Sequence, residues 1–138
     1  MKPILLALAF IGGLLIASAG IGATSPAKHL AAVAREADSV VIEFYTSAGR
    51  EEVAFADKPW LERLAGILER SSYVPQSHCL CISYPQIRLY RNKELTGTLS
   101  VHHGTKLRAY AGSVSGDFTV GAQVGQEIAG LAKERKPD

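Results

Sequence analysis

The sequence has few cysteines, few aromatic residues and almost no excess charge. Only two of its 138 residues are cysteine, and 7% are aromatic. Small domains that rely on many disulfides are dense in cysteine, so the chain is not of that class. The 15 Lys and Arg residues nearly cancel the 13 Asp and Glu residues, which gives a net charge of +2. Nucleic-acid binding needs a basic stripe along one face, so we expect no nucleic-acid partner.

The rest of the composition is typical of a globular domain. Hydrophobic residues make up 47% of the chain and charged residues 20%. These fractions exclude disordered and collagen-like chains, whose apolar and glycine contents differ strongly from this. The length fits a single domain, and the sequence contains neither an internal repeat nor a low-complexity tract.

The first 19 residues have the three parts of a secretory signal peptide. Lys2 supplies a positive start, residues 4–16 form an apolar core, and small residues follow for the signal peptidase. The cleavage region comprises Ala17, Ser18 and Ala19. We therefore expect residues 1–19 to be removed and residues 20–138 to be exported, to the periplasm or outside the cell. The alternative is retention as a membrane anchor, because the apolar run continues weakly to residue 23.

Two segments carry the pattern of a helix N-terminus. Ser25 precedes a proline, and Asp57 precedes Pro59, so each has a capping side chain and a preset backbone angle. Apolar residues at helical spacing follow both of them. A third helix is expected to begin at a cap on Asp117 and to run to about Lys133, with Phe118 facing inward.

Alternating apolar and polar residues predict several short strands. We expect strands at residues 39–45, 51–55, 77–83, 86–91 and 94–102 and an edge strand at 106–110. Strands joined by short turns cannot be parallel neighbours, so the sheet should be largely antiparallel. The sequence therefore predicts an α+β fold in one small domain, residues 20–138, with two or three helices packed on one face of the sheet.

Both cysteines lie in one short segment, His78-Cys79-Leu80-Cys81. On an extended strand Cys79 and Cys81 would point to the same face. Their Cα atoms would then be ~7 Å apart, the upper limit for a disulfide, so a bridge would need a local bend. Two thiols on one face suit a disulfide or a shared metal. Buried thiols without chemistry and a disulfide to another chain are further alternatives.

A second segment, His102-His103-Gly104, supplies histidines that could complete a metal site. Two thiolates with one or two imidazoles suit Zn²⁺, and thiolates also suit Cu⁺. Adjacent strand residues face opposite ways, so at most one of these histidines should join the cysteines. His103 shares the apolar register, so we expect His103 to be buried and His102 exposed. The candidate redox or metal residues are Cys79, Cys81, His103 and His78.

The same segment also carries the features of an anion site. A glycine turn offers backbone N–H groups, and cationic side chains follow it closely, which together could hold a carboxylate or phosphate. The alternative is a solvated hairpin tip. The residues of this candidate site are His102, Gly104, Lys106 and Arg108.

The sequence contains no assembled catalytic constellation. It has no G-x-S-x-G motif around a serine, and no pair of carboxylates stands out. We therefore expect an exported, non-enzymatic module that binds an unknown protein or envelope partner or has a structural role in the envelope. We expect no cofactor, and membrane contact only if residues 1–19 are retained. The alternative is a thiol-based function at Cys79 and Cys81, either disulfide exchange or binding of Cu or Zn with a histidine ligand.

Overall fold

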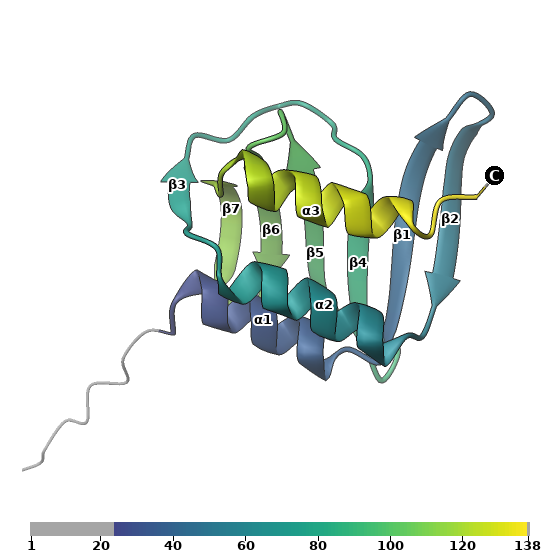
Figure 1. Ribbon diagram of the computed structural model, residues 1–138, viewed down its shortest axis with the longest axis horizontal. Helices are drawn as coiled ribbons and strands as arrows, with labels where there is room; N and C mark the ends of the chain where they lie inside the picture. The colour runs from purple at the N-terminus through teal and green to yellow at the C-terminus, as the bar shows by residue number, and fades with distance from the viewer. Residues whose placement is uncertain (1–23, 138) are drawn as a thin grey trace, which may run out of the picture.

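The computed structural model describes residues 24–137, which form an antiparallel sheet with three helices on one of its faces (Figure 1). The helices are α1 (Pro26–Glu36), α2 (Lys58–Glu69) and α3 (Ala122–Lys133). The strands are β1 (Ser39–Thr46), β2 (Gly49–Phe55), β3 (Val74–Gln76), β4 (Gln86–Arg91), β5 (Glu94–His102), β6 (Lys106–Ala111) and β7 (Val114–Thr119). The expected α+β architecture is confirmed for these residues. The signal peptide expected at residues 1–19 lies outside them and stays a prediction.

The order of the strands requires one loop, residues 77–85, to run past the ends of three strands. Within the described residues the seven strands lie in the order β2-β1-β4-β5-β6-β7-β3, and all neighbours are antiparallel. Short turns join β4, β5, β6 and β7 in succession, but β3 pairs with β7 at the far edge. Residues 77–85 must therefore pass β7, β6 and β5 to reach β4. Figure 1 shows this connection running past the upper ends of those strands.

The helices and the sheet enclose one hydrophobic core. Its fully buried strand residues include Ile42, Leu89, Leu99 and Leu107. Trp60 of α2 is 2% exposed, and its Nε1 donates to the carbonyl oxygen of Leu131 at 3.1 Å, which links α2 to α3. The ring of Phe55 meets the indole edge-to-face, with 5.1 Å between ring centroids. Burial of these side chains supplies most of the stabilisation of the fold.

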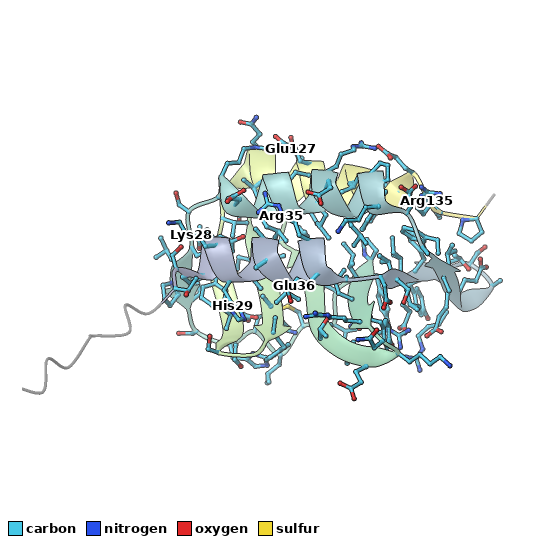
Figure 2. The ribbon with its side chains drawn as sticks, turned by 90° about the horizontal axis from the view of Figure 1, so that it is seen from below. Lys28, His29, Arg35, Glu36, Glu127 and Arg135 are labelled. Carbon is cyan, nitrogen blue, oxygen red and sulfur yellow. A yellow bond between two sulfur atoms is a disulfide. The ribbon has the colours of Figure 1, made fainter. Side chains whose placement is uncertain are left out.

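Two of the three helix N-caps predicted from the sequence are present. The Ser25 hydroxyl accepts the N–H of Lys28, and the Asp57 carboxylate accepts the N–H of Trp60 at 3.0 Å. Ion pairs then join the helices at the surface: Figure 2 shows Arg35 of α1 lying toward α2, where it pairs with Glu69. Such exposed pairs contribute at most about 1 kcal/mol each, so the helices are held mainly by their apolar faces.

Two strand predictions are wrong in position. Residues 77–83 form no strand, and the short strand in this region, β3, ends at Gln76. The backbone of residues 77–83 is bound by side chains of β6 and β7 instead of by a neighbouring strand. Residues 106–111 form β6 in the interior of the sheet rather than at its edge, because β7 and β3 lie outside it.

The last helix begins later than the sequence predicts. Asp117 and Phe118 belong to β7, and α3 begins at Ala122 with Gly121 as its N-cap residue. The Asp117 side chain is buried and pairs with Arg108 on the neighbouring strand, so it caps no helix. Phe118 enters the core from the strand, where it is 7% exposed.

A close contact fixes α3 against the turn between β5 and β6. Gly125 is buried in α3, and a Cβ added to it would overlap the carbonyl oxygen of Gly104. Only glycine permits this approach, because the obstacle is backbone and cannot rotate away. The helix therefore positions the turn that carries His103.

We predict that Gly125→Ala lowers the free energy of unfolding by about 1–3 kcal/mol, because the added methyl forces the turn and the helix apart. Gly130→Ala is the matched control in the same helix, since no atom lies within 4 Å of its added Cβ. That variant should raise stability by about 0.5–1 kcal/mol through helix propensity alone. Urea unfolding of both variants checks the contact, and equal stabilisation by the two alanines would contradict it.

Candidate metal centre

Four potential metal ligands converge from two segments of the chain. Cys79 and Cys81 come from the loop at residues 77–85, His102 ends β5, and His103 begins the turn to β6. One ligating atom from each of these side chains lies within 4.8 Å of all the others. The topology explains the convergence, because the loop must pass the end of β5 on its way to β4.

The distances between the sulfur and nitrogen atoms match those around a tetrahedral ion. His103 Nε2 lies 3.5 Å from Cys79 Sγ and 3.4 Å from Cys81 Sγ, and His102 Nδ1 lies 3.4 Å from Cys81 Sγ. Ligand bonds of about 2.3 Å to sulfur and about 2.0–2.1 Å to nitrogen place tetrahedral S and N ligands about 3.6 Å apart. The three distances from the disulfide sulfurs to the imidazole nitrogens are close to this separation.

The two sulfurs are joined as a disulfide, with the Cα atoms of Cys79 and Cys81 5.3 Å apart. This Cα separation is shorter than the ~7 Å expected for an extended strand and falls within the normal range for disulfides. The local bend that the sequence analysis requires for a bridge is thus present, because this part of the loop is not a strand. In this oxidised state the sulfurs cannot both ligate a metal as thiolates.

The expected burial of the two histidines is reversed. His102 is 4% exposed, whereas His103 is exposed to solvent. Leu99 faces the helices, so strand alternation places Ser100 and His102 on the opposite face, which the loop covers.

His103 also reaches the sulfurs, although adjacent strand residues should point apart. Its φ is +52°, so the strand has ended there and the chain has turned. The turn brings the His103 ring back beside that of His102, with 5.4 Å between ring centroids. The prediction that only one histidine can join the cysteines is wrong because it assumed a regular strand through both.

Arg108 of β6 binds the backbone of the loop at residues 77–85. Its guanidinium donates to the carbonyl oxygen of Cys81 at 2.9 Å and to that of Cys79. The N–H of Cys79 donates to Asp117 Oδ2 at 2.8 Å. These hydrogen bonds fix the peptide groups on both sides of Leu80 and involve neither sulfur atom.

Asp117 is a fully buried carboxylate beneath the candidate centre. Its side chain is 0% exposed and accepts hydrogen bonds from Arg108 Nε at 2.7 Å and Nη2 at 3.0 Å. The Arg108 guanidinium holds the pKa of Asp117 far below its usual range, and the N–H of Cys79 acts in the same direction. The carboxylate therefore stays ionised inside the protein.

His102 is oriented between this carboxylate and the sulfurs. Its Nε2 lies 3.6 Å from Asp117 Oδ1 and has no hydrogen-bond partner among residues 24–137, while its Nδ1 faces Cys81. Burial lowers the pKa of His102, which favours the neutral imidazole. In the tautomer with its proton on Nε2, the ring would direct the N–H toward Asp117 and the Nδ1 lone pair toward Cys81. Metal-ligating histidines commonly donate to a carboxylate through their other ring nitrogen, and Asp117 lies on the side of His102 where such a bond would form.

The remaining candidate residues lie around this cluster. His78 has its Nδ1 3.6 Å from Asp117 Oδ2 and lies outside the group of four ligands. Of the residues predicted to bind an anion, Gly104 lies in the turn, Lys106 begins β6, and Arg108 is engaged by Asp117 and the loop carbonyls. The anion site stays a prediction.

Sequence reasoning missed Asp117 as part of the site. Its only signal is the cross-strand pairing of Arg108 with Asp117 in the β6–β7 hairpin. That pairing depends on the register of β7, whose last residues the sequence pattern assigns to a helix beginning at Asp117.

Comparisons of this chain with family models, curated proteins and solved structures return no match. Among residues 24–137, no helix is long and apolar enough to span a membrane.

We predict that Arg108→Met lowers the free energy of unfolding by about 3–5 kcal/mol, because it leaves the buried Asp117 charge without its partner. Arg91→Met is the matched control, since the Arg91–Glu36 pair is exposed on both sides and its loss should change stability by less than about 0.5 kcal/mol. Chemical denaturation of both variants provides the measurement. A similar small effect for the two would show that the loop does not depend on Arg108.

Proposed function

We propose that the reduced chain binds one Zn²⁺ or Cu⁺ ion through Cys79, Cys81, His102 and His103. The observation that carries this proposal is the convergence of the four ligating atoms to within 4.8 Å of one another. Two further observations support it. The sulfur-to-nitrogen distances are close to those of tetrahedral coordination, and the buried carboxylate of Asp117 lies beside the buried imidazole of His102.

Metal binding requires the dithiol form of the cysteines. Each thiol loses its proton as the metal binds, so two thiolates and two neutral imidazoles surround the ion. Zn²⁺ neutralises the two thiolate charges, and Cu⁺ leaves one negative charge near Arg108. The sulfurs must also separate to about 3.8 Å, the edge of a tetrahedron with 2.3 Å bonds. Rotation about the Cα–Cβ bonds supplies this separation while the backbone hydrogen bonds of the loop stay in place.

Four protein ligands complete the coordination of such an ion. A closed tetrahedral site has no position for water or substrate, so it suits holding or transferring a metal rather than hydrolytic catalysis. Together with the signal peptide expected at residues 1–19, this supports an exported metal-binding module. The proposal combines the non-enzymatic role with the thiol-based alternative, both expected from the sequence.

A metal titration of the reduced protein tests this function. We predict that dithiothreitol-treated protein, freed of reductant without air, binds one Co²⁺ per chain with thiolate-to-cobalt charge transfer and strong tetrahedral d–d absorption. Zn²⁺ should displace the cobalt, and a parallel Cu⁺ titration with a chromophoric competitor determines which ion binds more tightly. Cys79→Ser and Cys81→Ser should each lower the affinity by at least about tenfold.

His78→Ala is the matched control, because His78 adjoins the cysteines but lies outside the ligand group. Its affinity should stay within about twofold of that of the unchanged protein. Absence of binding by the reduced protein, or equal losses in the Cys81→Ser and His78→Ala variants, would contradict the proposed centre.

A further inference from the structure

Two aliphatic side chains project from the loop that carries the cysteines. Leu80 is 94% exposed and Ile82 is 77% exposed. The sulfurs of Cys79 and Cys81 meanwhile face the histidines. The hydrogen bonds from Arg108 to the loop carbonyls hold the backbone on both sides of Leu80, so the loop cannot fold this side chain inward.

We infer that a protein with a reactive dithiol docks on Leu80 and Ile82 and reduces the Cys79–Cys81 disulfide. The inference rests on the proposed function, because the disulfide must open before the cysteines ligate a metal, and it names the partner that controls loading. A protein surface gains by covering two aliphatic side chains, whereas a small thiol does not. Both cysteines are partly exposed, so the partner can reach the bond between them.

The reaction is a thiol–disulfide exchange in two steps. A thiolate of the partner attacks one sulfur, which forms a mixed disulfide and releases the other cysteine as a thiolate. The second thiol of the partner then attacks the partner's own sulfur in the mixed disulfide and releases the second cysteine. Two electrons pass to the Cys79–Cys81 pair, and the partner leaves as a disulfide. The two protons of the partner's dithiol end on the cysteine thiols and are released when a metal binds.

The contacts of the two sulfurs favour attack on Cys81. The N–H of Cys81 donates to Cys79 Sγ at 3.3 Å, so a thiolate on Cys79 is stabilised as it leaves. The mixed disulfide therefore forms through Cys81, immediately beside Leu80 and Ile82.

The test compares a protein reductant with a small one. Oxidised protein is reduced either by thioredoxin with its reductase and NADPH or by dithiothreitol, and the thiols that appear are titrated over time. The double variant Leu80→Ser/Ile82→Ser should lose about tenfold in rate with thioredoxin and change by less than about twofold with dithiothreitol. The control is Val74→Ser/Leu95→Ser, which removes side chains of 54% and 56% exposure from outside the loop and should leave both rates unchanged.

Equal thioredoxin rates for the loop variant and the unchanged protein would overturn the docking inference. An equal fall with both reductants would also overturn it, because the substitution would then have altered the disulfide itself. Zinc binding after reduction with dithiothreitol separates the two proposals. If the reduced protein binds zinc but the loop variant and the unchanged protein react equally fast with thioredoxin, only the docking inference is wrong. If the loop variant loses rate selectively with thioredoxin but the reduced protein binds no zinc, only the proposed metal centre is wrong.

Discussion

The ion pair between Arg108 and Asp117 is the interaction on which the candidate centre depends. Burying a carboxylate and a guanidinium costs several kcal/mol per ion, so such a pair persists only where hydrogen bonds complete it. Here those bonds come from the loop: Asp117 accepts the N–H of Cys79, and Arg108 donates to two loop carbonyls. Residues 77–83 pair with no neighbouring strand, and the side chains of Arg108 and Asp117 supply hydrogen bonds to their backbone instead. We regard its role as placing the loop over the end of β5 rather than as adding net stability.

The same framework is compatible with the disulfide and with the proposed metal-bound dithiolate. The bonds that hold the loop involve backbone groups of Cys79 and Cys81 and leave the sulfurs free to form a disulfide or to ligate a metal. The histidines approach the sulfurs even in the disulfide state, so the proposed metal site would require movement mainly of the two sulfurs. Such preorganisation favours metal binding, because the ligands lose little conformational freedom when the ion arrives.

The sequence was sufficient for the local elements and insufficient for the site. Helix caps at Ser25 and Asp57 and the β4–β5 hairpin depend on neighbouring residues, and pattern reasoning found them. The convergence of His102 and His103 depends on a left-handed residue that ends the strand between them, which alternation alone does not reveal. Asp117 was assigned to a helix cap because its partner, Arg108, is specified only by the pairing of β6 with β7. Cys79, Cys81 and His103 are named as candidate ligands from the sequence, whereas the buried position of His102 and the contribution of Asp117 depend on the chain turn after β5 and on strand register.

X-ray absorption at the zinc edge of the reduced, zinc-loaded protein tests the central claim most directly, because it reports the ligand atoms themselves. The account predicts two sulfur ligands at about 2.3 Å and two nitrogen ligands at about 2.0–2.1 Å. Replacing His102 with alanine should remove one nitrogen and retain both sulfurs. A spectrum with only nitrogen and oxygen ligands would place the zinc elsewhere on the protein and contradict the account.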